Sequence, residues 1–170
     1  MIPSGSQTVG PFFNFALSAD LSLGVMAREG ATGERIRIVF HLFDGDGIPA
    51  PGDAMIELWQ ADAEGRYVDA DPNFRGFGRL ETDVEGTCGF ETIMPGSVAN
   101  AAPHINVTIF ARGLLKQLHT RLYFALDPTD AVLALVPQAR RATLLARKQE
   151  DAWHMDIRLQ GEGETVFFDL

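Results

Sequence analysis

RIRIVFHLF, residues 35–43, alternates apolar and polar side chains along one extended run. Side chains of a β-strand point to opposite faces in turn, so every second residue shares a face. One face of this run carries Ile36, Ile38, Phe40 and Leu42, and the sequence Asp-Gly-Asp-Gly at 44–47 then turns the chain. The pattern predicts a strand with one buried face, followed by a tight turn.

The same alternation recurs between Gly, Asp and Pro turn signals along the rest of the chain. We expect strands at 54–60, 78–82, 87–93, 104–110, 120–124, 154–159 and 166–168, a short extended piece at 66–68, and a turn at 83–86. Many short strands with regular turns are typical of an antiparallel sandwich. The sequence therefore predicts a mainly β fold, an antiparallel β-sandwich at residues 35–170, in a single-domain protein of 170 residues.

Three segments depart from the strand pattern. Residues 140–149 hold good helix formers without Gly or Pro, which predicts one short C-terminal helix. The run 127–130, Asp-Pro-Thr-Asp, is suited to cap a helical turn through Leu135, because its side-chain oxygens accept the first amides of a helix. Residues 1–34 are different, since the apolar stretch Gln7–Phe13 has no period and its Gly-Pro pair favours an extended path. We expect an N-terminal arm that packs on another surface.

Composition excludes several classes of function. A net charge of −9 with scattered basic residues argues against nucleic acid and anionic membranes as partners. Cys88 is the single cysteine, which excludes an internal disulfide and a thiolate zinc cluster. No leader-like segment or long apolar run is present, so we expect a cytoplasmic protein with Cys88 in its core.

The segment Pro103–Val107 carries half of a metal-ligand pair. His104 and Asn106 share one face of a strand, where two histidines would chelate a metal ion. An amide oxygen is a poor ligand for the metals that imidazoles bind. On this spacing alone, His104 is either a remnant ligand or a histidine that hydrogen-bonds at a strand start.

Several separate segments together resemble one known family, the intradiol ring-cleavage dioxygenases. Each segment is weak alone, but their order and spacing are specific and span nearly the whole chain. They are Gln7–Phe13, Leu58–Asp62 with Gly65–Tyr67, Met94–Gly96, Pro103–Asn106, Thr120–Phe124 and Gln160–Asp169.

The resemblance implies a ferric site that this chain has lost. The family binds non-haem Fe(III) with two tyrosines and two histidines, and Tyr67 and His104 match the first of each pair. Asn106 stands where the second histidine would be, and residues 97–99 hold no second tyrosine. We expect no metal on this chain, with Tyr67, His104 and Asn106 as remnant ligand positions and Fe(III) bound by a homologous beta subunit.

The resemblance also implies how such a chain contributes to catalysis. Thr8, Gly10, Pro11 and Arg112 match residues that line the partner's substrate cleft, with Arg112 assigned as catalytic. The implied reaction cleaves protocatechuate with O2 to 3-carboxy-cis,cis-muconate. Gly-Pro lets backbone approach a flat ring, and Arg112 offers permanent charge to a carboxylate. On position alone, Gly10-Pro11 as a plain turn and Arg112 as a surface cation stay open.

Two other functions compete with that of a non-metal subunit. One is a self-sufficient metalloenzyme with altered ligands, which Asn106 and the missing tyrosine disfavour. The other is a β-sandwich scaffold or binding module with no direct role in an active site. Glu162 and Glu164 are typical of a solvated turn, and the sequence assigns no chemistry to the remaining histidines, which are His41, His119 and His154.

Overall fold

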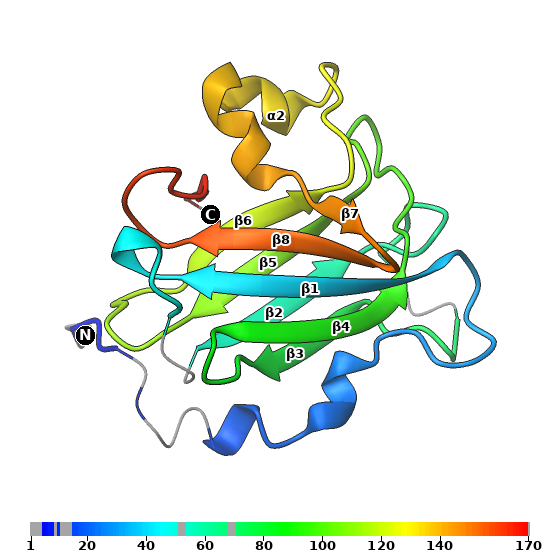
Figure 1. Ribbon diagram of the computed structural model, residues 1–170. Coiled ribbons are helices and arrows are strands. Elements are labelled where there is room, and N and C mark those ends of the chain that lie inside the picture. The colour runs from blue at the N-terminus through cyan, green and yellow to red at the C-terminus, as the bar shows by residue number, and fades with distance from the viewer. Residues whose placement is uncertain (1–4, 9, 11–14, 51–53, 68–70, 170) are drawn as a thin grey trace.

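Two four-stranded sheets lie face to face in the computed structural model, which describes residues 5–8, 10, 15–50, 54–67 and 71–169 (Figure 1). The strand orders are β4-β1-β8-β7 and β3-β2-β5-β6. The strands are β1 (Arg35–Phe43), β2 (Met55–Gln60), β3 (Phe77–Glu81), β4 (Thr87–Ile93), β5 (His104–Phe110), β6 (Leu118–Tyr123), β7 (Arg147–Gln149) and β8 (Ala152–Arg158). The predicted sandwich is confirmed.

Strand β1 is the centre of the first sheet and buries the face that its sequence predicts. Ile36, Ile38, Phe40 and Leu42 are all at most 9% exposed. The Phe40 ring meets the Phe90 ring of β4 edge-on, at 5.9 Å between centroids. These side chains join those of the facing sheet in one core. Alternation therefore places β1 correctly, because the apolar face must leave water.

One strand pair runs against the antiparallel prediction. β1 pairs with β4 antiparallel but with β8 in parallel, from Arg37 opposite Ala152 to Phe43 opposite Arg158. The other strand pairs are antiparallel. Short turns join consecutive strands only in antiparallel order, but β1 and β8 are far apart in the chain. Turn chemistry therefore does not set their direction.

Most predicted strand boundaries are close to the observed ones, and β1, β4 and β5 match at both ends. The stretch 166–168 forms no strand and contributes a single bridge, between Phe168 and His119. Arg66 and Tyr67 of the predicted extended piece lie outside the strands, and its last residue, 68, is not among the described residues.

The helical predictions have mixed outcomes. Asp130 caps α2 (Ala131–Leu135) as predicted, because its Oδ1 accepts the Val132 and Leu133 amides at 2.8 and 2.9 Å. The helix predicted at 140–149 is wrong. A 3-10 helix, η3, spans Gln138–Leu144, and the residues after it form β7. A short helix is marginal by itself, so strand pairing with β8 overrides helix propensity. Within the described ranges, no helix has the length and apolarity needed to cross a membrane.

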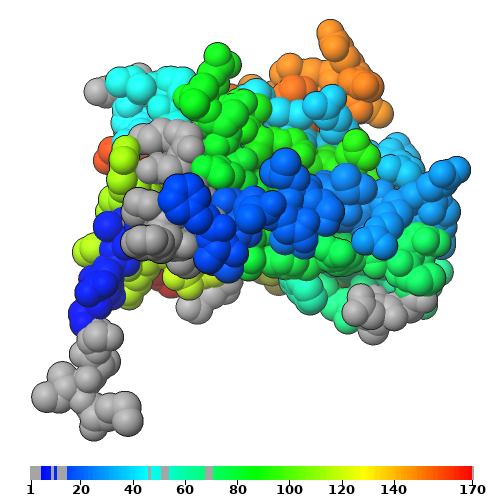
Figure 2. All heavy atoms as spheres, turned by 90° about the horizontal axis from the view of Figure 1, so that it is seen from below, coloured from blue at the N-terminus to red at the C-terminus, as the bar shows by residue number. Residues whose placement is uncertain are grey.

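The N-terminal segment lies partly on the sandwich. The 3-10 helix η1 (Leu21–Gly24) packs on β3, and Met26 and Ala27 are buried in the core. Figure 2 shows residues 15–30 laid across the face of the molecule seen from below. Residues 5–8 and 10 are exposed. The predicted boundary at residue 34 and the docking of the arm on a partner stay predictions.

Candidate functional site

The predicted site residues fall into two groups at opposite ends of β5. His104 and Asn106 lie at its start, whereas Arg112 follows its end. A strand rises about 3.4 Å per residue, so His104 and Phe110 are roughly 20 Å apart. We call Tyr67, His104 and Asn106 the remnant site, and Thr8, Gly10 and Arg112 the arm edge.

Tyr67 of the remnant site follows a turn that its own sequence fixes. The Asp62 carboxylate accepts the Glu64 and Arg66 amides at 2.9 Å each, and the Arg66 side chain at 3.0 Å. Burial opposes ionisation of Asp62, but these hydrogen bonds hold its pKa below the usual value. Gly65 has φ +80°, and a side chain there would overlap the Ser97 carbonyl. The turn therefore packs closely against Ser97, in the loop where the resemblance implies a second tyrosine.

The side-chain amide of Asn106 makes hydrogen bonds through both its nitrogen and its oxygen. Its Nδ2 donates to the Tyr67 hydroxyl at 3.0 Å and to the Trp59 carbonyl at 3.2 Å. Its Oδ1 accepts from Arg121 Nε at 3.1 Å. The sheet register explains this, since Asn106 lies between Trp59 on β2 and Arg121 on β6. Tyr67 also stacks on Trp59, with ring centroids 6.0 Å apart.

His104 is held through Ala102, which is in turn fixed by Asp130, the N-cap of α2. Its Nδ1 donates to the Ala102 carbonyl at 2.7 Å, and the Ala102 amide donates to Asp130 Oδ2 at 2.9 Å. His104 is 4% exposed, and its ring lies 5.7 Å from that of Tyr123. Burial lowers the pKa of His104, and the charge of Arg121 acts in the same direction against the hydrogen bond to Ala102. His104 is therefore a neutral, hydrogen-bonded core residue near neutral pH.

These residues do not fit a ferric ion. Oδ1 is the ligating atom of an asparagine, and here it accepts a hydrogen bond from a cation. Residues 97–99 supply no tyrosine. Across the described ranges, no three His, Cys, Asp or Glu side chains are grouped so that they could hold a metal ion. What remains of the site is a hydrogen-bonded polar network.

The arm edge joins two segments that are far apart in the chain. The Gly113 amide donates to Thr8 Oγ1 at 2.7 Å, across 105 positions of sequence. Arg112 is exposed beside this contact, and Gly113 has φ +96°. Gly10 is exposed, and a Cβ added there would meet no described atom within 4 Å, while Pro11 lies outside the described residues. The structure therefore brings Thr8 to Gly113, the residue that follows Arg112, and the substrate-binding role of this edge stays a prediction.

Arg121 is the site residue that sequence reasoning missed. It donates to Asn106 and also, through Nη1, to the Tyr123 hydroxyl at 3.3 Å. The available signal was the alternation of residues 120–124, which places Arg121 and Tyr123 on one face. Burial raises the pKa of Tyr123, while Arg121 opposes that shift.

The sequence analysis also did not predict a pair of histidines that lies outside the remnant site. His41 Nε2 lies 3.1 Å from His154 Nδ1, with the rings stacked 5.4 Å apart, and His41 Nδ1 lies 3.2 Å from Thr87 Oγ1. The pair lines a groove of about 580 Å³ beside Arg147 and Arg158. The two histidines are 113 positions apart, so only the β1–β8 pairing brings them together.

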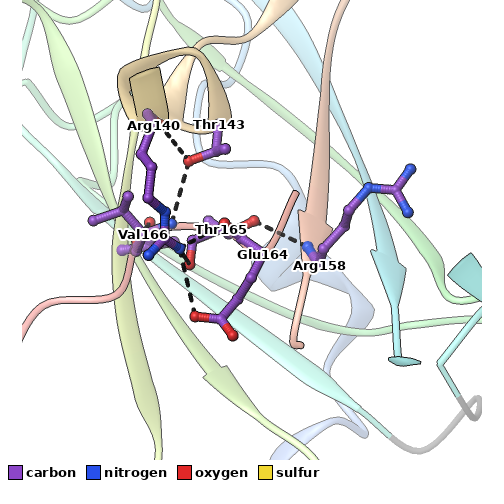
Figure 3. A network of polar contacts seen from close by, with 7 residues as sticks. Arg140, Thr143, Arg158, Glu164, Thr165 and Val166 are labelled. Carbon is purple, nitrogen blue, oxygen red and sulfur yellow. Dashed lines mark hydrogen bonds and ion pairs between the residues drawn. The ribbon is translucent and has the colours of Figure 1, made fainter. Parts of the chain in front are cut away.

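The C-terminal segment contributes Gly163 to this groove and is tied down by hydrogen bonds. Figure 3 shows Glu164 to Val166 tied to η3 and β8. Arg140 donates to the Glu164 carbonyl at 2.8 Å and pairs with its carboxylate at 3.4 Å, while the Arg158 amide donates to Thr165 at 2.9 Å. Glu162 is exposed, which agrees with a solvated turn.

Comparisons with known proteins place this chain among the ring-cleaving dioxygenases. A family model described as "Dioxygenase" matches residues 9–161, so the chain belongs to that family, the intradiol dioxygenases. The chain is 41% identical to the protocatechuate 3,4-dioxygenase alpha chain of Pseudomonas putida, over 97% of this chain and 95% of that one. The beta chain from Burkholderia cepacia is 33% identical, over 95% of this chain and 77% of its own length.

A solved structure supports the fold independently. The dioxygenase domain of a dioxygenase–carbohydrate-binding fusion from Streptomyces sp. SirexAA-E superimposes with a TM-score of 0.66. The match covers 97% of this chain and 100% of that one, at 24% identity. The resemblance found in the sequence is thus confirmed for both family and fold.

Proposed function

We propose that this chain is the non-metal alpha subunit of a protocatechuate 3,4-dioxygenase. The observation that carries the proposal is the pairing of 41% identity to such an alpha chain with a remnant site that does not fit iron. Fe(III) belongs to a homologous beta subunit, where it supplies the chemistry of ring cleavage. The assembled enzyme cleaves protocatechuate with O2 to 3-carboxy-cis,cis-muconate in the cytoplasm.

In this proposal the arm edge lines the partner's substrate cleft. Together with Pro11, the arm edge supplies the Thr8 hydroxyl, a backbone at Gly10 that a flat ring can approach closely, and the Arg112 guanidinium. Two observations support this role. The edge lies roughly 20 Å along β5 from the remnant site, so it does not serve that site. Arg112 and Thr8 are exposed, as groups that act on a neighbouring chain must be. Arg112 would pair with the substrate carboxylate.

The partner is a chain of the same fold, which constrains how the two dock. Homologous subunits commonly pair about a two-fold or nearly two-fold axis, so each presents the same two patches to the other. If the arm edge of this chain reaches the partner's iron cleft, the corresponding edge of the partner faces the remnant site of this chain. Trp59 and Tyr67 are 51% and 38% exposed there, and Trp and Tyr commonly anchor interfaces.

Reconstitution tests the proposal against the alternative of a scaffold module. The chain is co-expressed with an iron-bearing beta chain, and consumption of protocatechuate and O2 is measured together with iron per heterodimer. We expect a stable heterodimer with about one iron, whose activity exceeds that of the beta chain alone. A beta chain equally active alone would favour a scaffold role, and iron bound stoichiometrically by this chain alone would contradict a non-metal subunit.

A further inference from the structure

The remnant site contains a cation of its own. Arg121 donates from Nε to Asn106 and from Nη1 to Tyr123, so its guanidinium lies between Asn106 of the remnant site and the neighbouring Tyr123 hydroxyl. Asn106 in turn donates a hydrogen bond to the Tyr67 hydroxyl. The guanidinium thus contacts Asn106 directly and is connected through Asn106 to Tyr67.

The position of this charge has a chemical consequence. A guanidinium stays protonated at every pH a protein experiences, so its charge cannot be lost to admit a metal. Two cations a few ångströms apart repel strongly in a partly buried site. Arg121 also occupies Oδ1, the one atom of Asn106 that ligates metals. Missing ligands and a resident cation are therefore two separate obstacles to metal binding.

We propose that Arg121 is a built-in cation that closes the remnant site to metal ions, so that restoring the missing histidine alone does not restore metal binding. The guanidinium holds the Asn106 amide, and this amide in turn donates to the Tyr67 hydroxyl, so two of the three remnant ligand positions are joined without a metal. This inference concerns the chain by itself and does not depend on the proposed function.

The test compares variants that restore the ligand with and without the charge. Asn106→His adds the imidazole, and Asn106→His/Arg121→Gln also removes the charge while keeping an amide donor. Co2+ is the probe, and its binding to the full-length chain is measured by equilibrium dialysis and by its visible spectrum. We expect the double variant to bind Co2+ at least about tenfold more tightly than Asn106→His, or about 1.4 kcal/mol.

Two further double variants test whether the effect comes from the charge at position 121. They exclude the space freed by a shorter side chain and the lower net charge of the chain as explanations. Asn106→His/Arg121→Lys shortens the side chain but keeps the cation, so it should bind Co2+ as weakly as Asn106→His. Asn106→His/Arg79→Gln removes an arginine elsewhere on the same sheet, one paired with Glu57, and should also bind weakly. Circular dichroism confirms that each variant folds. Equal Co2+ affinities across the set, or no measurable binding by any folded variant, would overturn the inference.

Discussion

Asn106 makes three hydrogen bonds that a histidine in its place could not reproduce. Its amide donates to Tyr67 and Trp59 and accepts from Arg121, whereas an imidazole has neither that geometry nor that number of donors. The loss of a metal ligand is therefore accompanied by a satisfied polar network. Such a network removes the cost of leaving polar groups unpaired in a partly buried site.

Arg112 gives the most direct test of the arm edge. In the assembled enzyme, Arg112→Ala should lower kcat/KM for protocatechuate at least about tenfold, or about 1.4 kcal/mol, because it removes a fixed charge beside a carboxylate. Iron content should not change, since the partner holds the metal. Steady-state kinetics with protocatechuate and with catechol, which lacks the carboxylate, give the measurement, and catechol should show the smaller loss.

The control for Arg112 is Arg37→Ala, which removes an exposed guanidinium from β1. It should leave both rates within about twofold, as surface substitutions usually have small effects. Equal losses for both substrates in Arg112→Ala would mean that Arg112 holds the cleft or interface together. No loss for either would place it outside the active site.

Cys88 should be chemically silent in the folded protein. Burial, with a smaller contribution from Asp83, raises the pKa of its thiol from 9.0 to about 12. Only about one thiol in ten thousand is then ionised at pH 8, and the thiolate is the reactive form. A disulfide-exchange reagent at pH 8 should react no faster than the protein unfolds, and immediately in denaturant. Fast modification of the native chain would contradict this environment.

The raised pKa of Cys88 also predicts how the free energy of unfolding depends on pH. The folded state holds the thiol proton more tightly than the unfolded state, so this contribution is present below pH 9. It decreases as the pH rises from 9 toward 12, where the unfolded thiol ionises first. Cys88→Ala should remove this alkaline slope from urea unfolding curves.

At the scale of elements, α2 supports the remnant site through one side chain. Asp130 is fully buried and accepts three amides, two at the start of α2 and one from Ala102, which in turn positions His104. Asp130→Ala removes the cap and leaves buried donors unpaired. We expect a loss of about 2–4 kcal/mol in the free energy of unfolding, measured with urea.

A neighbour of Asp130 offers the matched comparison. Asp127 accepts the Thr129 amide and hydroxyl in the same loop but is exposed. Asp127→Ala should cost less than about 1 kcal/mol, because water replaces the lost hydrogen bonds. Similar losses for the two variants would show that the contact to Ala102 adds nothing to the stability of this element.

At the scale of the whole molecule, docking on a partner should cover Trp59. The chain has two tryptophans, Trp59, half exposed on β2, and Trp153, partly buried on β8. Labelled with 5-fluorotryptophan, the chain gives two fluorine NMR signals, which Trp59→Phe assigns. On addition of an unlabelled beta chain, the Trp59 signal should shift and lose its sensitivity to D2O, while that of Trp153 stays the same. An active complex with an unchanged Trp59 signal would exclude this face from the interface.

The sequence alone determined much of the fold because its signals are local. Period-two alternation gave β1, β4 and β5, and the capping chemistry of Asp130 gave the start of α2. The spacing of His104 and Asn106 marked the remnant site, since both lie on one face of one strand. In each case the deciding interaction joins residues a few positions apart, where backbone geometry fixes which side chains meet.

Only the tertiary structure decided the contacts between distant segments. These are the parallel β1–β8 pair with its two histidines, the contact of Thr8 with Gly113, and the guanidinium of Arg121 on Asn106. Residues 140–149, predicted as a helix, form the end of η3 and the strand β7. Pairing with β8 provides hydrogen bonds for the backbone of β7, and this outweighs the helix propensity of the segment. Local patterns do not encode which strands become neighbours. Burial of the core that the two sheets share sets the pairing and register of the strands, and the register determines which side chains meet in the site.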